Sequence, residues 1–166
     1  MKTKKVSGYI IDALFELLKT KPLSEISATE LIEKAGVCRS SYYRNFYLLE
    51  DVIKAFGREL FQRISQLPPI SREDPELQIR GVYECFLTEK ERLRLLDQHN
   101  LFHLLDDLFY AQCVQQIQSL KLFHQLYEVD FYAGASVFVA RSWVHNGFRE
   151  TPEEMARVTH SFIKWD

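Results

Sequence analysis

Apolar residues recur along most of the chain at intervals of three and four positions, which is the spacing of an amphipathic α-helix. The first stripe runs through Val6, Ile10, Leu14 and Leu18 and predicts a helix over about residues 3–20. The alternation of period two that is typical of strands is missing throughout the sequence. The pattern therefore predicts an all-α protein, with about nine helices in total.

Two short helices are expected next, joined by a sharp turn. Ser27 and Glu30 have the spacing of a capping box, and Gly36 ends the first short helix because glycine readily adopts left-handed backbone. The short helices are expected over about 28–35 and 39–45, and a long helix over about 49–66. A helix followed by two short helices around a glycine turn is the helix-turn-helix pattern.

The stretch Leu67–Ser71 contains two consecutive prolines and interrupts the helical pattern. We place a domain boundary there, which divides the chain into domains 1–66 and 67–166. Further helices are expected from Pro75, over about 92–98, 102–118 and 125–146, and from Pro152 to the C-terminal end.

Composition fits a folded protein and excludes several classes. Hydrophobic residues make up 46% of the 166 positions, and there are only 6 Gly and 5 Pro, so a disordered or collagen-like chain is excluded. The 3 cysteines are widely spaced, so neither a disulfide framework nor a zinc site is expected, and a reducing cytoplasm is the natural compartment. Asp12 and Glu16 interrupt the first apolar stretch, and no run of about 18 apolar residues exists. We therefore expect neither a secretory leader nor a membrane-spanning helix.

The net charge of −2 argues against nucleic-acid binding only while the chain is taken as a whole. Residues 1–66 have a formal charge of +3, and residues 67–166 have −5. Basic side chains gather at Lys2, Lys4 and Lys5 and again at Arg39 and Arg44. The first part is therefore mildly basic, and its nucleic-acid affinity must come from specific contacts and from dimerisation.

The second short helix has the side chains that a DNA-reading helix needs. The major groove, about 12 Å wide, accepts a slim helix face that is rich in hydrogen-bond donors. That face consists of Arg39, Ser40, Ser41, Tyr43 and Arg44. Tyr42 and Phe46 are four positions apart and are expected to point inward. Ser27, at the start of the preceding helix, can hold a phosphate together with the free amides there.

The stretch Ile26–Phe56 resembles the N-terminal DNA-binding domain of the TetR family of bacterial transcriptional regulators. The matching residues are Glu30-Leu31-Ile32, Ala35-Gly36-Val37, Tyr43, Phe46 and Glu50-Asp51-Val52. The rest of the chain is similar to the C-terminal domain of small TetR-type regulators from Gram-positive bacteria, mainly in Trp143–Phe148 and Thr151–Ala156. The resemblance implies an all-helical homodimer with an N-terminal DNA reader and a C-terminal domain for dimerisation and effector sensing.

The resemblance also implies roles for individual residues. Arg39, Ser40 and Ser41 would face base edges, whereas Tyr43, Arg44 and Ser27 would mainly touch phosphates. The full predicted DNA-binding set is Ser27, Thr29, Cys38, Arg39, Ser40, Ser41, Tyr43 and Arg44.

Several positions depart from the family pattern. Cys38 stands where the family usually has Ser, which weakens the N-cap by about 1 kcal/mol. Leu48-Leu49 replaces a common Ser-Lys and so removes a cap and a positive charge. Asn45 replaces a common His, and Ser40 replaces a frequent Gly.

The stretch Phe131–Val144 is apolar nearly all round, so a helix there must be covered on both sides. We expect this helix and the last helix to form a four-helix dimer interface with their symmetry mates. The predicted interface residues are Phe131, Ala135, Phe138, Val139, Trp143, Met155, Val158, Thr159 and Phe162. The alternative is a central core helix in a monomer.

An apolar ligand cavity between the C-terminal helices is a further candidate site. Its predicted residues are Tyr83, Phe86, Phe102, Phe109, Cys113 and Arg141. The alternative is an ordinary packed aromatic core. Arg141 needs a partner if it is buried, and a structural pair with an acid such as Glu84 or Asp130 is more common than an anionic ligand.

Weaker signals favour structural roles. His99 and His103 are four apart but lack a third metal ligand, so no metal site is expected. Adjacent helical residues diverge by about 100°, so Asp106 and Asp107 indicate a solvated face and not a catalytic pair. Cys38 would be a redox switch only with a depressed pKa, of which the sequence gives no sign. The chain shows no set of nucleophile, base and orienting residue and no phosphate loop, so an enzyme is not expected.

The sequence thus predicts a dimeric regulator of transcription without a cofactor, most simply a repressor that binds a double-stranded DNA operator. A small-molecule effector or partner protein at the C-terminal domain would release it, and ligand and DNA affinities would be reciprocally coupled. The alternative is a TetR-like dimer with weakened DNA binding that acts through a partner protein. Leu48, Leu49 and Ser40 motivate this alternative.

Overall fold

The computed structural model describes residues 5–68, 73–119 and 126–162. These ranges contain nine α-helices and no strands, which confirms the predicted all-α class. The helices are α1 (Val6–Leu18), α2 (Ala28–Ala35), α3 (Arg39–Asn45), α4 (Leu49–Ile64), α5 (Pro75–Thr88), α6 (Lys90–Gln98), α7 (Asp106–Ser119), α8 (Leu126–His145) and α9 (Pro152–Phe162). Two 3₁₀ turns, Leu23–Glu25 and Phe102–Leu105, complete the described structure.

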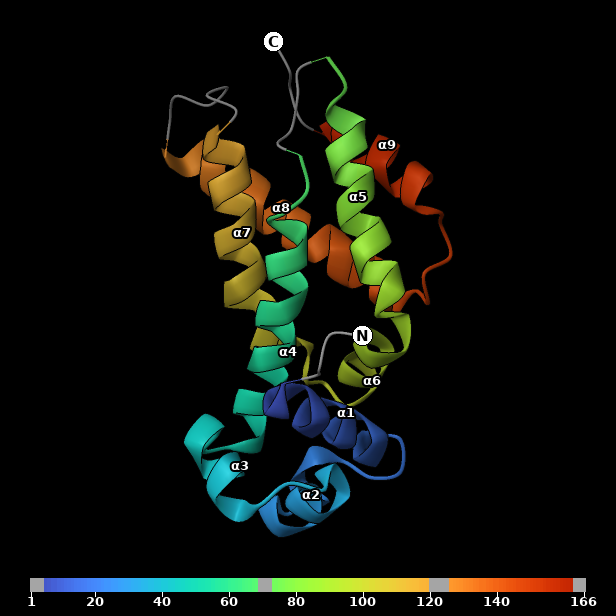
Figure 1. Ribbon diagram of the computed structural model, residues 1–166. Helices are drawn as coiled ribbons and strands as arrows, with labels where there is room; N and C mark the ends of the chain where they lie inside the picture. Colours follow the sequence, from blue (N-terminus) through green and yellow to red (C-terminus); the bar gives the residue numbers. More distant parts are fainter. Residues whose placement is uncertain (1–4, 69–72, 120–125, 163–166) are drawn as a thin grey trace.

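The helices form two groups that α4 connects. Figure 1 shows α1, α2 and α3 gathered at one end, with α4 leading from them into the body of the molecule. There α5 packs along α9 and α7 packs along α8, while α6 contacts α1 on one side and α8 on the other. The small end and the larger body therefore meet at α1, α4 and α6.

Local sequence signals explain several helix starts. Ser27 Oγ accepts a hydrogen bond from the Glu30 backbone N–H at 3.1 Å, and Asp74 Oδ1 accepts one from Leu77 at 3.1 Å. The expected helix over 102–118 instead divides into the 3₁₀ turn and α7. A Cβ placed on Gly57 would lie 2.6 Å from Leu105 Cδ2, so glycine permits the close approach of α4 to this turn.

One large hydrophobic cluster joins the two groups of helices, and Ile117, Val129 and Ala133 form a second, smaller cluster between α7 and α8. Ile10 and Leu14 of α1 belong to the same buried cluster as Leu60 of α4, Phe86 of α5 and Trp143 of α8. The helix break after α4 lies at the expected place, next to Pro68. The division into domains 1–66 and 67–166 remains a prediction, because α4 packs against both groups of helices.

Candidate nucleic-acid interface and internal cavity

The turn between α2 and α3 depends on the backbone of Gly36. Its φ of 65° is left-handed, and its N–H donates to the Glu33 carbonyl at 3.1 Å. The next N–H, of Val37, donates to the Ile32 carbonyl at 3.3 Å. A Cβ at Gly36 would meet no atom within 4 Å, so the backbone angle and not a lack of space requires glycine here.

Two aromatic side chains anchor α3. Tyr42 is fully buried and Phe46 nearly so, and their ring centroids lie 6.0 Å apart. The opposite side of α3 is exposed and carries Arg39, Ser40, Tyr43 and Arg44, with Ser41 half-buried at its edge. The structure therefore brings the predicted DNA-reading side chains together on one outward face.

Polar contacts tie this face to α2. The Arg39 guanidinium donates to Thr29 Oγ1 at 3.2 Å, which joins the first turns of α3 and α2. Ser27 Oγ already accepts the Glu30 N–H, so its own O–H remains as a donor toward an external acceptor. Lys5 is exposed at the start of α1, whereas Lys2 and Lys4 lie outside the described residues. Arg39 and Thr29 are thus joined beside α3, and Ser27 lies two positions before Thr29 at the start of α2.

Cys38 is the N-cap residue of α3 and is exposed. Its Sγ lies 3.2 Å from Ser40 Oγ and 3.1 Å from Ser41 Oγ. Hydrogen bonds from these two hydroxyls, Ser40 first, lower the pKa of the Cys38 thiol from 9.0 to about 7. The sequence analysis missed this lowered pKa. Its signal was a cysteine at an N-cap followed by serines two and three positions later.

The start of α4 keeps part of its cap despite the apolar pair Leu48-Leu49. The Asp51 carboxylate accepts the backbone N–H of Leu48 at 2.9 Å and that of Tyr47 at 3.2 Å. These two bonds, the one from Leu48 first, lower the pKa of Asp51. The expected loss of this cap is therefore only half right. Leu48 lacks a capping oxygen, but the acid three positions later still satisfies two backbone donors.

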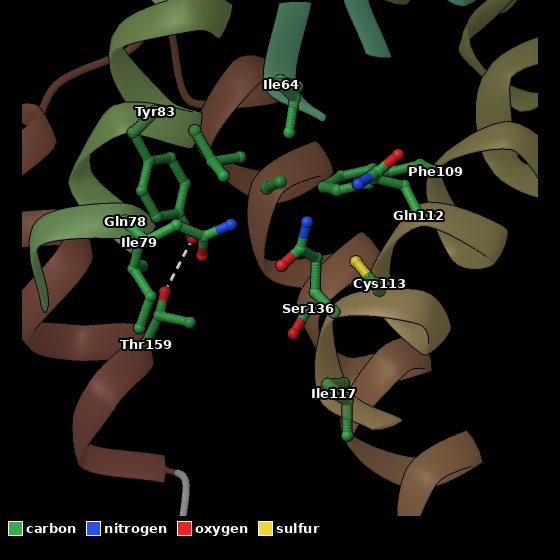
Figure 2. Close-up of a pocket in the computed structure, with 13 residues that line it drawn as sticks. Ile64, Gln78, Ile79, Tyr83, Phe109, Gln112, Cys113, Ile117, Ser136 and Thr159 are labelled. Carbon is green, nitrogen blue, oxygen red and sulfur yellow. Dashed lines mark hydrogen bonds between the residues drawn. The ribbon is translucent and has the colours of Figure 1, made fainter. Parts of the chain in front are cut away.

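A second candidate site is a partly open cavity of about 80 Å³ between the C-terminal helices. It lies among α5, α7, α8 and α9, next to the end of α4, and Figure 2 labels ten of its residues. The lining comprises Ile64, Gln78, Ile79, Val82, Tyr83, Phe109, Gln112, Cys113, Gln116, Ile117, Ser136, Ala140 and Thr159. The predicted residues Tyr83, Phe109 and Cys113 are among them.

The other three predicted cavity residues lie elsewhere. Phe86 and Phe102 are buried in the core outside the lining. Arg141 forms an ion pair with Asp106 at 3.5 Å, so its expected pairing with Glu84 or Asp130 is wrong. The reason is tertiary, because Arg80 already pairs with Glu84 and Tyr110 donates to Asp130. A structural pair for Arg141 was the correct interpretation, but the packing of α7 on α8 selects its partner.

The polar groups of the cavity stay uncharged. Tyr83 Oη and Thr159 Oγ1 share a hydrogen bond of 2.7 Å, drawn as a dashed line in Figure 2. Burial raises the pKa of Tyr83 to about 12 and that of the Cys113 thiol to about 12. The sequence analysis missed Gln78 and Gln112. The signal for Gln112 was its place between Phe109 and Cys113 on one helix face. The signal for Gln78 was its place next to Ile79 and four positions before Val82.

The outer face of α8 and α9 is apolar and exposed. Phe131 is 69% exposed, Phe138 67% and Phe162 62%, and Ala135 and Val158 share this face. A groove between the two helices is lined in part by Phe138, Val139, Val158 and Phe162. The other predicted interface residues, Trp143, Met155 and Thr159, are buried within the chain. Six of the nine predicted interface residues are therefore available on this surface, with Val139 half-buried.

The weaker signals have structural partners. His99 Nε2 lies 2.7 Å from the Leu18 carbonyl, and His103 Nδ1 lies 2.9 Å from the Asn100 carbonyl. Within the described residues no group of His, Cys, Asp or Glu has the geometry of a metal site. Asp106 pairs with Arg141, while Asp107 is exposed. Across the same residues, no helix has the length and apolarity to cross a membrane.

Comparisons with known proteins agree with this architecture. Residues 79–164 match the family model TetR_C_8, a transcriptional regulator C-terminal region, while no curated protein matches the chain. A TetR transcriptional regulator from Streptococcus agalactiae 2603V is similar in structure, with a TM-score of 0.67, 16% identity, and coverage of 96% of this chain and 93% of that chain. The dihydroxyacetone kinase operon activator DhaS has a TM-score of 0.66 and 12% identity, covering 95% of this chain and 93% of its own. The fatty acid degradation regulator FadR from Bacillus halodurans has a TM-score of 0.58 and 14% identity, covering 98% and 96%. At sequence identities of 12–16%, the structural similarity shows that this chain has the same fold as these proteins.

Proposed function

Because the chain belongs to the TetR family of transcriptional regulators, we propose that it is a dimeric DNA-binding repressor. Its operator would be double-stranded DNA, and an effector or partner at the C-terminal helices would release it. The observation that carries the proposal is the outward face of α3, where Arg39, Ser40, Tyr43 and Arg44 are exposed opposite the buried Tyr42. Such a face supplies donors to base edges and phosphates in a major groove.

The exposed face of α8 and α9 supports dimerisation. Phe131 and Phe138 lie seven positions apart on one side of α8, and Phe138 and Phe162 line one groove. Monomeric proteins rarely leave so many large apolar side chains of one face open to water. A two-fold axis through this face would pair α8 and α9 with their symmetry mates and place two α3 helices on one side of the dimer. Two recognition helices about one turn of DNA apart, roughly 34 Å, would then read the half-sites of a palindrome.

The junction between the two groups of helices supports a coupled response. Arg92 of α6 contacts Asp12 of α1 at 2.6 Å and Glu89 at 3.2 Å. His99 Nε2 lies 2.7 Å from the Leu18 carbonyl, at the end of α1. A shift of α6 would therefore move α1 and, with it, the spacing of the α3 pair. The spacing of the α3 pair with the effector bound and the spacing without it would fit DNA differently. Effector and DNA would therefore oppose each other's binding by the same factor.

A fluorescence-anisotropy titration of DNA from the promoter region beside the protein's own gene tests the proposal. We expect salt-sensitive binding, which Arg39→Ala weakens by about 1–3 kcal/mol with relaxed specificity. Lys5→Ala should weaken all DNA sequences alike, because a phosphate contact carries no sequence information. Arg94→Ala is the charge-matched control, since Arg94 is exposed on α6 away from α3. Absence of salt-sensitive binding to every fragment would refute the proposal.

One observation favours a second function, a co-regulator that acts through a partner protein. Tyr47 is 85% exposed and Leu48 61% exposed beside α3, where the family pattern has a Ser-Lys pair in place of Leu48-Leu49. Exposed apolar side chains at this position suit a protein contact better than a phosphate contact. Pull-down from native extract before and after nuclease treatment separates the two functions, since only the repressor requires DNA for its associations.

A further inference from the structure

The cavity contains two buried amide nitrogens that have no hydrogen-bond partner among the described residues. Gln78 on α5 is 3% exposed, and Gln112 lies on α7. The Nε2 atoms of both are buried and unpartnered. Figure 2 shows the two amides directed into the same space from opposite walls. A buried donor without a partner is costly, so these two amides mark the place where a ligand atom is expected.

The three hydroxyl side chains of the cavity have hydrogen-bond partners. Tyr83 and Thr159 bond to each other at 2.7 Å, and Ser136 Oγ donates to the Tyr132 carbonyl at 2.8 Å. The Ser136 hydroxyl is therefore used, whereas one hydroxyl of the Tyr83–Thr159 pair donates to the other and the second keeps its O–H. The amide nitrogens of Gln78 and Gln112 differ from these groups because they are buried and have no partner at all among the described residues.

Charge is absent from the walls of the cavity. None of its lining residues is Lys, Arg, His, Asp or Glu, and the raised pKa values of Tyr83 and Cys113 keep both side chains neutral. A charged ligand would therefore lose its hydration without gaining a counter-ion. This excludes carboxylates and ammonium groups, although the amide nitrogens alone would suit an anion.

The volume limits the size of the ligand. A cavity of about 80 Å³ is smaller than the engineered cavity of roughly 150 Å³ that admits benzene. It accepts a body of about four or five carbon atoms, or the end of a longer molecule. Ile79, Phe109 and Ile117 provide the apolar walls that such a body needs.

We propose that this cavity binds a small uncharged organic molecule whose carbonyl or hydroxyl oxygen accepts hydrogen bonds from Gln78 and Gln112. The proposal rests on the proposed function, because it names the chemical class of the effector. The oxygen lies between α5 and α7 and draws the two helices together, while the apolar body lies against Phe109 and Ile117. Binding therefore changes the packing of α5, which ends at the Glu89 contact with Arg92.

The test uses a matched series of ligands on the full-length protein labelled with ¹⁵N. Cyclopentanone supplies the oxygen, methylenecyclopentane has the same shape without an acceptor, and cyclopentylammonium and cyclopentanecarboxylate carry opposite charges. Affinities come from NMR titration, and the side-chain NH₂ signals of Gln78 and Gln112 report the hydrogen bonds directly. We expect the ketone to shift both signals and the charged analogues to bind at least about 100-fold more weakly.

Variants separate the amides from simple hydrophobic binding. Gln78→Leu with Gln112→Leu removes both donors at similar volume, and Gln115→Leu on the exposed side of α7 is the matched control. The ratio of ketone to hydrocarbon affinity should fall at least about tenfold in the double variant and stay unchanged in the control. If the double variant does not fold, the same affinity ratio is measured with the single variant Gln78→Met.

Three results would overturn the ligand class: no amide shift with ketone, equal binding of a charged analogue, or an unchanged affinity ratio in the amide variants. DNA binding of the same preparations is measured separately by anisotropy. If one of those three results is found and DNA binding is intact, only the proposed ligand class is refuted. If the ketone binds through the two amides but the protein binds no DNA, only the proposed function is refuted.

Discussion

Replacing Phe138 with alanine should dissociate the proposed dimer. Phe138 is 67% exposed on the outer face of α8 and lies in the groove between α8 and α9. A phenylalanine buries about 150–250 Å² when fully covered, so dimerisation would remove roughly 100–170 Å² of its surface from water. At about 25 cal/mol per Å², this burial contributes about 2.5–4 kcal/mol per protomer. Alanine keeps the Cβ, so we expect a loss of about 2–3 kcal/mol per protomer.

The two-fold axis doubles the effect, because the same substitution occurs on both sides of the interface. The dimer should weaken by about 4–6 kcal/mol, which corresponds to a factor of about 10³–10⁴ in Kd. Sedimentation equilibrium over a range of concentrations measures this directly. Circular dichroism should remain helical, since Phe138 contributes little to the core of its own chain.

Tyr47→Ala is the matched control, since Tyr47 is 85% exposed beside α3, far along the chain from α8. It removes an aromatic side chain of similar size and should leave the dimer unchanged. A Phe138→Ala protein whose Kd stays within threefold of the original would refute the interface. Equal weakening by both variants would point to a general loss of solubility and not to a specific contact.

Four further predictions concern the fold and the predicted DNA-binding face. Cys38 should react with iodoacetamide half-maximally near pH 7, because hydrogen bonds from two serines lower its pKa, and bound DNA should protect it in a mass-spectrometric assay. Asp51→Asn should cost about 0.3–1 kcal/mol in urea unfolding at pH 7. Because the folded-state pKa of this carboxyl lies below its ordinary 3.8, the difference should disappear as the pH falls through that lowered value. Thr159→Val should cost about 1–3 kcal/mol by leaving the buried Tyr83 hydroxyl unpaired, and a further Tyr83→Phe change should restore part of it. Gly36→Ala should destabilise by about 1–3 kcal/mol, because φ is 65°, and equal or greater thermal stability would contradict that reason.

The sequence was sufficient where structure depends on local spacing. The stripe through Ile10 and Leu14 predicted α1, and Ser27 with Gly36 predicted both ends of α2. The side of α3 that points inward followed from the four-residue spacing of Tyr42 and Phe46. Each of these features is decided within one or two helical turns, so the printed order of residues contains the information.

The sequence did not predict contacts between side chains that lie far apart along the chain. Arg141 pairs with Asp106, 35 positions away, because α7 packs along α8. Gln78 is a polar residue within the apolar stripe of α5, and the packing of α5 on α9 buries it. Such choices depend on the angle and offset between helices, which spacing along one helix does not determine.

The connection between cavity and α3 depends more on packing than on charge. Arg63, Glu89, Arg92 and Asp12 form a chain of ion pairs from α4 to α1. Partly exposed pairs of this kind contribute only about 0–1 kcal/mol each, too little to move a helix by themselves. The Arg92 guanidinium also lies 5.3 Å from the centre of the Phe15 ring and 5.6 Å from that of Phe56, so its charge is fixed against the buried core.

The helix that spans this distance is α4. Its last residue, Ile64, lines the cavity, and its first turn follows α3 directly, so 16 residues of continuous helix separate the two sites. A helix of that length extends about 24 Å and moves as a rigid body on the scale of a ligand-induced shift. Since α1 and α7 both pack against α4, an effector that displaces Ile64 would change the position of α3 through the core itself. The ion pairs around Arg92 would add little to this coupling, whose energy would come from the repacking of buried side chains.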